Sequence, residues 1–325
     1  MVKLQRYLWP KTLLLFYTNE NALEVAFGYI EKDSVVIEVR RTFEGKEREQ
    51  ELAKWYNEIL QTYPKTYLVT MLDTVNQGAI FGCSKQELEK FNIESSLTHT
   101  ICIEDSWLAY VSFVEIKWFE KRHKLLSLDF IFSPFVLVYE KIKPNLTNTP
   151  VLTVLHHKGV LYIAVFSNEG LWFSQTLTIL EDSLDDDVVE GKETSEDDDF
   201  GMEFDLDNVD ADMDSVDDID TLDEFKDEST EEESSDTDEG TGLGLLEQDL
   251  NFFNKLKSSI ESFYHDDKYK HDFLEGIFIY DIDSKIGKDV VNYIQEELLI
   301  NCSLQAFDPI DLMSSLACND LKGFK

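Results

Sequence analysis

The side chains in this sequence that are most capable of chemistry are carboxylates, and three of them are spaced like the start of a calcium-binding loop. Asp210, Asp212 and Asp214 alternate in the way that the first ligands of such a loop do. The loop also needs a glycine at its sixth position and a glutamate at its twelfth, where this chain has Ser215 and Thr221. The sequence therefore does not predict a specific calcium site.

Two adjacent histidines are the second group of side chains that could bind a metal ion or take part in catalysis. His156 and His157 would face opposite sides of a strand and could not bind one metal ion together. Because Lys158 and Gly159 follow them, we interpret the four residues as a polar hairpin tip. No serine or cysteine nucleophile has locally supported partners, and no glycine-rich phosphate loop occurs. The sequence thus predicts no catalytic residue, no metal site and no cofactor.

Four cysteines are scattered along the chain without the spacing of a metal site: Cys83, Cys102, Cys302 and Cys318. The N-terminus shows no apolar stretch of the kind that directs secretion, and the longest apolar run is far shorter than a membrane span. We therefore expect a cytoplasmic protein whose cysteines are reduced and mostly buried.

Charge is very unevenly distributed over the 325 residues, whose formal net charge is −37. Residues 181–240 contain 30 acidic residues and two lysines, so the remaining 265 residues have a net charge of only −9. Such a polyanion repels nucleic acids and anionic lipid surfaces, which disfavours direct binding to either. With few apolar residues to offset chain entropy, the segment 181–244 is predicted to be disordered.

Apolar residues nevertheless recur every three or four positions within this acidic segment: Leu206, Val209, Met213, Val216, Ile219, Leu222 and Phe225. A pattern of this kind often folds only against a partner, so Met213, Val216 and Ile219 are candidate partner-binding residues. The alternative is a solvated tether with scattered hydrophobic residues.

Outside the acidic segment, hydrophobic periodicity predicts an alternation of strands and helices. Strands are expected at 12–18, 23–29, 35–41, 66–72, 130–141, 151–155, 160–166, 170–180, 276–280 and 302–307. Helices are expected at 48–62, 246–264, 290–299 and 311–318, with a short helix after Ser84 in which Glu87 completes a capping box. Residues 108–123 are amphipathic and fit either a helix or a strand. The result is two three-stranded meanders, each followed by further helices and strands.

This order of elements resembles the actin-like ATPase architecture, an α/β fold of duplicated ribonuclease H-like lobes. More narrowly, it resembles the PilM family of type IV pilus assembly proteins and the GspL-type platform proteins of type II secretion. The resemblance rests on residues 13–25, residues 151–175, and the segments 249–264, 277–281 and 304–309. It implies a first lobe at 1–148 and a second lobe at 149–180 and 245–325, interrupted by the acidic insertion 181–244.

The departures from this family fall at the positions that contact phosphate. Nucleotide-binding members begin each of two phosphate hairpins with Asp-x-Gly and carry a glycine cluster after a late strand. The corresponding positions here hold Tyr17 and Asn19, Leu155 and His157, and Asp281 and Asp283. Loss of the carboxylates removes a means of holding Mg²⁺, and two aspartates in place of glycines would repel phosphate. The resemblance therefore implies a degenerate fold without nucleotide and without enzymatic activity.

A function follows from the resemblance as an expectation. The family implies a cytoplasmic scaffold that holds the short cytoplasmic tail of a membrane-anchored partner, in a groove near Phe130, Phe132 and Phe135. The net charge favours a basic tail, and such a scaffold could form a homo-oligomer or ring. The machine served could be a pilus, a secretion or DNA-uptake apparatus, or a polar flagellar motor. A divergent actin-like ATPase and an acidic adaptor or chaperone acting through its polyanion are the alternatives.

Overall fold

The computed structural model describes residues 10–179 and 239–323, except for residues 33 and 271. The chain divides into two units, residues 1–180 with 242–325, and residues 181–241. Met213, Val216 and Ile219, which were predicted to bind a partner, lie outside the described residues. Among the described residues, no helix is long and apolar enough to cross a membrane.

The first sheet is built around its buried central strand. Its strands are β1 (Thr12–Thr18), β2 (Ala22–Glu31), β3 (Ser34–Glu44), β4 (Thr66–Met71) and β8 (Phe130–Phe132). They lie in the order β3-β2-β1-β4-β8, and β1 pairs antiparallel with β2 and parallel with β4. Every residue from Leu13 to Phe16 is buried, as expected for a strand that is covered on both faces.

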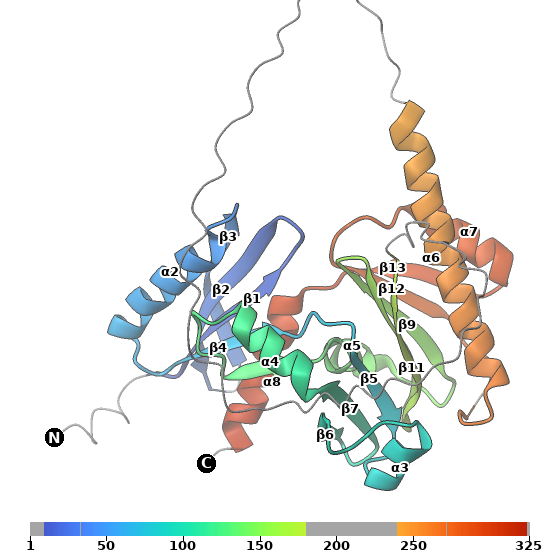
Figure 1. Ribbon diagram of the computed structural model, residues 1–325, viewed down its shortest axis with the longest axis horizontal. Helices are drawn as coiled ribbons and strands as arrows, with labels where there is room; N and C mark the ends of the chain where they lie inside the picture. The colour runs from blue at the N-terminus through green and yellow to red at the C-terminus, as the bar shows by residue number, and fades with distance from the viewer. Residues whose placement is uncertain (1–9, 33, 180–238, 271, 324–325) are drawn as a thin grey trace, which may run out of the picture. The chain divides into compact units, whose positions relative to one another are not determined.

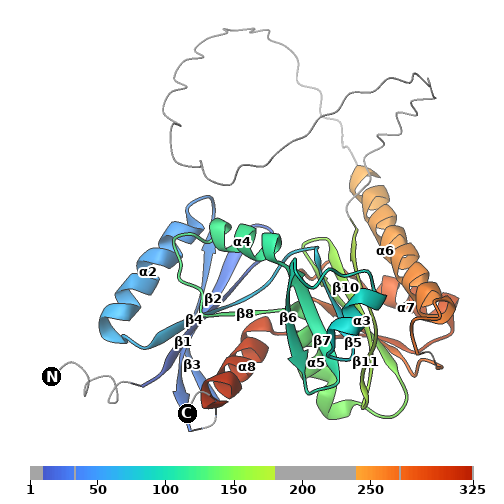
Figure 2. The same cartoon turned by 60° about the horizontal axis from the view of Figure 1, so that its bottom comes forward.

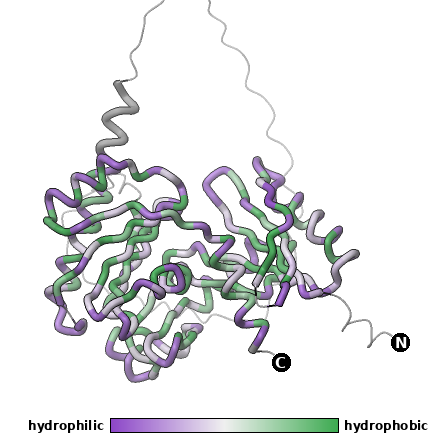
Figure 3. Tube along the Cα trace, turned by 180° about the vertical axis from the view of Figure 1, so that it is seen from behind, coloured by the Kyte–Doolittle hydropathy of each residue, from purple (hydrophilic) through white to green (hydrophobic). Residues whose placement is uncertain are grey.

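The second sheet repeats the topology of the first. Its strands are β9 (Val151–His157), β10 (Val160–Ser167), β11 (Gly170–Thr178), β12 (Ile277–Asp281) and β13 (Cys302–Gln305). The order β11-β10-β9-β12-β13 matches the first sheet strand for strand, with the same parallel and antiparallel pairs. The predicted duplicated α/β fold is confirmed. Hydrophobic residues are concentrated along these strands (Figure 3).

Helices cover both faces of each sheet, and the alternation of side chains along the strands decides which helix each residue meets. In β1, Leu14 and Phe16 pack toward α2 (Arg48–Thr62), whereas Leu13 and Leu15 face the opposite layer. In the second sheet, one face is covered by α6 (Glu239–His265) and α7 (Lys288–Leu298).

Two helices cross from the lobe in which they arise to the other sheet. The helix α5 (Pro134–Ile142) follows the first sheet, yet its Phe135 lies in the core beneath β9 and β10. The helix α8 (Pro309–Gly323) follows the second sheet and packs its Met313 and Ala317 against β1 and β4, where Figure 1 shows it. Each lobe therefore completes the hydrophobic core of the other.

The fold also contains a small three-stranded sheet, in which the cysteines differ from the sequence-based prediction. This sheet contains β5 (Gln77–Phe81), β6 (Thr98–Ile103) and β7 (Trp107–Ser112) in the order β5-β7-β6, with α3 (Lys85–Lys90) between β5 and β6. A disulfide joins Cys83 to Cys102, so the prediction of four reduced thiols is wrong for these two residues. The pairing of β5 and β6 with β7 brings both cysteines to one end of this sheet, with a Cα–Cα distance of 5.4 Å. Cys302 and Cys318 are free and buried, as predicted.

Two segments, one predicted as a strand and one left ambiguous, each form a strand followed by a helix. The predicted strand 130–141 is wrong beyond Phe132, because Pro134 stands in the first turn of α5, where proline favours helix initiation. Residues 108–123 divide at Ser112, which ends β7 and accepts a hydrogen bond from the Val114 amide to begin α4 (Phe113–Arg122). The predicted capping box of Ser84 and Glu87 is confirmed at the start of α3.

Candidate functional site

Charged residues cluster at the carboxyl ends of equivalent strands in the two sheets. The carboxyl ends of neighbouring parallel strands meet at one edge of a sheet, so polar residues that follow them come close together. In the first sheet, Asp73 follows β4; in the second, β12 ends at Asp281 and β9 ends at His157. The β9–β10 turn places Lys158 at its tip with a positive φ of 51°, next to Gly159 at 70°.

Lys158 forms an ion pair across the two lobes. Its Nζ lies 2.6 Å from Asp73 Oδ2, and Arg122 Nη1 lies 3.0 Å from Asp73 Oδ1. The carboxylate of Asp73 is only 5% exposed. Burial alone would raise the pKa of Asp73, but Lys158 and Arg122 outweigh it and hold the pKa below its ordinary value. Asp73 is therefore a buried anion that depends on two cations from other elements.

The two histidines pair with the two aspartates that follow β12. His156 Nδ1 lies 2.9 Å from Asp281 Oδ1, and both side chains are almost fully buried. Asp281 also accepts hydrogen bonds from the backbone amides of Asp283, at 3.1 Å, and Ile286, at 2.6 Å. Although burial tends to raise the pKa of Asp281, these donors lower it overall. The interpretation of the histidines as a polar hairpin tip is wrong, because they are buried residues of β9.

Asp283 fixes the position of the hairpin turn. Its carboxylate accepts a hydrogen bond from the Lys158 backbone amide, and His157 Nδ1 lies 3.4 Å from its other oxygen. Burial raises the pKa of Asp283, but the contacts with His157 and with the Lys158 amide lower it overall. The ring of Tyr17 from the first lobe packs edge-on toward His157, with centroids 6.4 Å apart.

Several buried polar atoms near these turns have no hydrogen-bond partner among the described residues. They include His157 Nε2, Asn19 Oδ1 and Thr74 Oγ1, together with His157 Nδ1 and Asp283 Oδ1, which lie 3.4 Å apart without the geometry of a hydrogen bond. Buried polar groups are normally paired, so this region has hydrogen-bonding capacity that the chain itself leaves unused. No group of three or more histidine, cysteine, aspartate or glutamate side chains in the described part of the chain is arranged to hold a metal ion.

Of the six predicted phosphate positions, five lie in or beside this cluster. Leu155 is the exception, since its side chain is fully buried in the core beneath the second sheet. Sequence reasoning missed Asp73, Lys158 and Arg122. Asp73 could have been found from its position just after the buried strand β4. In the second sheet β12 is the equivalent strand, and Asp281 and Asp283 lie at its end.

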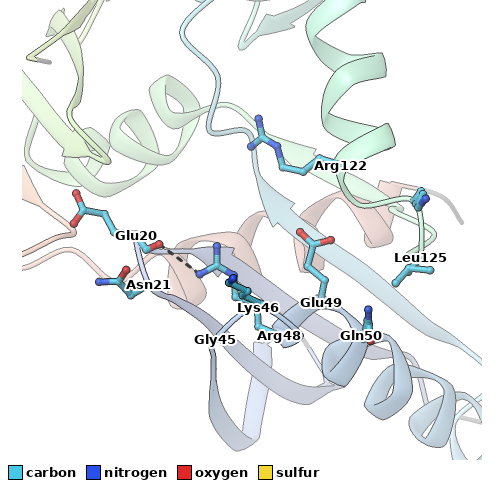
Figure 4. Close-up of a pocket in the computed structure, with 10 residues that line it drawn as sticks. Glu20, Asn21, Gly45, Lys46, Arg48, Glu49, Gln50, Arg122 and Leu125 are labelled. Carbon is cyan, nitrogen blue, oxygen red and sulfur yellow. Dashed lines mark hydrogen bonds between the residues drawn. The ribbon is translucent and has the colours of Figure 1, made fainter. Parts of the chain in front are cut away.

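A pocket of about 630 Å3 adjoins the cluster in the first lobe. It lies between the β1–β2 turn, the start of α2 and the end of α4, and Figure 4 shows the ends of the two helices facing each other across it. Its lining residues are Glu20, Asn21, Gly45, Lys46, Arg48, Glu49, Gln50, Arg122, Lys124 and Leu125. Arg122 belongs to both features, because it lines the pocket and also pairs with Asp73.

The pocket carries more cations than anions, and one of its anions is already paired. Glu20 forms an ion pair with Lys285 from the second lobe. Burial raises the pKa of Glu49 despite its nearby cations. In the part of the chain that the structure describes, Lys46 and Lys124 have no ion-pair partner. The basic tail predicted from net charge therefore finds no electrostatic match in this pocket.

The aromatic residues that the resemblance assigned to the partner groove fall in different environments. Phe130 and Phe132 lie on β8 and are partly buried against the core of the first lobe. Phe135 is only 1% exposed and packs edge-on against Tyr162, with ring centroids 5.8 Å apart, in the core of the second lobe. Phe135 is therefore a core residue and does not present its side chain to a partner.

Two family models together match most of the chain. One, described as a domain of unknown function (DUF8341), matches residues 152–322. The chain belongs to this family. A second, described as a domain of unknown function (DUF8569), matches residues 9–139. No protein of curated function matches the chain in sequence.

Solved structures resemble the chain in fold over most of its length. A PilM–PilN type IV pilus biogenesis complex matches with a TM-score of 0.50 at 10% identity, over 94% of this chain and 90% of the other. A Bacteroides thetaiotaomicron protein with an actin-like ATPase fold has a TM-score of 0.45 at 8% identity, covering 95% and 96%. The cytoplasmic domain of EpsL, from the type II secretion system of Vibrio cholerae, has 0.31 at 9%, covering 52% and 72%.

Identity at this level bears on the fold alone. The repeated strand order of the two sheets agrees with the similarity to the PilM–PilN complex over 94% of the chain, and the chain has a PilM-like, actin-like fold.

Proposed function

We propose that this protein is a non-catalytic scaffold of a type IV pilus-like or type II secretion-like machine. In this role it binds no nucleotide and holds the cytoplasmic part of a membrane-anchored partner. The actin-like fold supports the proposal at its coarse level, because the similar proteins include a PilM–PilN complex and an inner membrane component of a secretion system. A place in a flagellar motor or a DNA-uptake apparatus fits the same fold.

The observation that carries the nucleotide-free part is the internal pairing of the β9–β10 turn with Asp73, which follows β4, and with Asp283, which follows β12. The resemblance assigns this region to the phosphates of a nucleotide, yet Lys158 is paired with Asp73 and its amide is bonded to Asp283. A phosphate entering there would have to break these contacts while facing the carboxylates of Asp73, Asp281 and Asp283. Repulsion between buried like charges makes that exchange unfavourable.

Isothermal titration with Mg·ATP and Mg·ADP tests this part directly. We expect no saturable heat up to millimolar nucleotide and no shift in melting temperature, whereas a ligand at a hundred times its Kd would add about 2.7 kcal/mol of stability. Sub-millimolar binding would contradict the proposal and favour the alternative of a divergent ATPase.

Membrane recruitment through a protein tests the scaffold part. We expect the purified chain to sediment with native inner-membrane vesicles, and to lose binding after the vesicles are treated with protease. Liposomes made from the extracted lipids serve as the matched control and should not bind. Equal binding to the liposomes, or no binding to native vesicles, would refute the scaffold.

Deletion of residues 181–242 separates the scaffold from an acidic adaptor. A scaffold that binds through its lobes should keep its binding to native vesicles, and an adaptor that works through the polyanion should lose it.

A further inference from the structure

An exposed apolar row runs along α4 toward the basic pocket. Val114 and Trp118 are each 60% exposed, although large hydrophobic side chains are usually covered. They are four residues apart and so lie on one face of the helix, one turn before Arg122. Leu125, which is 51% exposed, continues the apolar surface at the mouth of the pocket. Figure 2 shows the end of α4 beside the start of α2. Residues at both of these helix ends line the pocket.

Positively charged side chains flank this apolar row. The ammonium of Lys121 lies over the Trp118 ring, 5.2 Å from its centroid, and further cations follow at Arg122 and Lys124. Across the pocket, Lys46 adds a charge that no ion pair in the described residues neutralises. The neighbouring helix α2 begins at Arg48 without a side-chain cap, so its first amides add a partial positive charge to the same wall.

The positive lining is unusual for this protein. Outside residues 181–240 the chain has a net charge of −9, yet the pocket contains four basic residues and two acidic ones. A ligand that matches this surface therefore needs both carboxylates and apolar side chains. From Val114 to Arg122 the helix rises about 12 Å, which is the length of two turns of a peptide helix.

We propose that α4 and the pocket together bind an acidic, amphipathic peptide segment of a partner protein. Its apolar residues pack on Val114 and Trp118, and its carboxylates face Lys46, Arg48 and Lys124. The proposal rests on the proposed function only in treating the chain as a binding protein, and it replaces the basic tail expected from net charge with an acidic one at this surface.

A labelled peptide provides the direct test. The probe is a fluorescein-labelled 16-residue peptide with leucine or phenylalanine at every third or fourth position and aspartate or glutamate elsewhere. Its matched control carries lysine in place of every acidic residue. Fluorescence anisotropy with the full chain should show saturable binding of the acidic peptide and much weaker binding of the basic one. Because the chain as a whole repels an acidic peptide, such binding requires a local site.

Variants locate the site. Trp118→Ala should weaken binding by about tenfold, as removal of an exposed aromatic anchor does in peptide grooves. The double variant Lys46→Glu/Lys124→Glu should also weaken it by about tenfold, since each reversal replaces attraction by repulsion. Phe273→Ser and Lys257→Glu are the matched controls. Both residues are exposed and lie outside α4 and the pocket, so their substitution should leave the affinity unchanged.

Three outcomes would overturn the inference. They are an absence of acidic-peptide binding, tighter binding of the basic peptide, and equal effects of the site and control substitutions. Vesicle binding by Trp118→Ala and by the unaltered chain separates the two proposals. If the unaltered chain binds native vesicles but shows no saturable binding of the acidic peptide, the docking surface is wrong and the scaffold stands. If neither chain binds vesicles, the scaffold fails independently of the peptide result.

Discussion

The ion pair between Lys158 and Asp73 offers the sharpest test of how the β9–β10 turn of the second lobe is held against the loop after β4 of the first lobe. Asp73 is 5% exposed, and its partners are Lys158, at 2.6 Å, and Arg122, at 3.0 Å. Lys158→Met removes the charge, keeps most of the apolar stem, and leaves a buried carboxylate with Arg122 as its remaining partner. Breaking a buried pair in this way usually costs about 3–5 kcal/mol. Because Lys158 is 25% exposed and Arg122 remains, we expect about 2–3 kcal/mol.

A double-mutant cycle isolates the pairwise contribution. Asp73→Asn alone leaves Lys158 partly exposed and able to reach water, so we expect a smaller loss of stability than for Lys158→Met. The combined variant should be more stable than the sum of the two losses predicts, with a coupling energy of about 1–2 kcal/mol. Urea unfolding followed by far-ultraviolet circular dichroism measures each free energy of unfolding.

The pH dependence provides an independent reading of the same pair. The pKa of Asp73 is lower in the folded protein than its ordinary value, so its contribution is present at neutral pH and lost as pH falls through the folded pKa. The Asp73→Asn variant should lack that part of the acid destabilisation. Strict additivity in the cycle, or a loss below about 0.5 kcal/mol for Lys158→Met, would refute the description of Asp73 as a buried anion that depends on its partners.

Two further predictions concern the first lobe and the small sheet. Burial lowers the pKa of His123 to about 4, so the unfolded chain binds its proton first and stability should fall by up to about 3 kcal/mol between pH 6.5 and 4. His123→Leu should remove that slope in urea unfolding measured at several pH values, and an unchanged slope would contradict the burial argument. The disulfide closes a loop between Cys83 and Cys102, so the Cys83→Ser/Cys102→Ser variant should lose up to about 3 kcal/mol. Reductant should lower the melting temperature of the unaltered chain but leave that of the variant unchanged, and equal responses would argue against the bond.

Local patterns were sufficient to predict most of the strands and helices. The periodicity of residues 48–62 and 246–264 identified α2 and most of α6, and the two meanders were recognisable from alternating apolar runs and polar turns. The segment 130–141 was misread because its apolar residues form a continuous run, which does not distinguish a buried strand from a buried helix. The proline at 134 carried the information that a helix begins there.

The candidate site could be predicted only in part. From the sequence alone, the resemblance predicts that the phosphate positions around Tyr17, His157 and Asp281 lack the family's acidic and glycine residues, because residue identity is local information; this assignment stays a prediction. Only the tertiary structure shows which partners the residues of this cluster contact. His156 meets Asp281 across 125 positions of sequence, and Lys158 meets Asp73 across 85. The parallel register of β9 and β12 brings His156 to Asp281, and the packing of the two lobes brings Lys158 to Asp73. Neither composition nor periodicity encodes such long-range pairing.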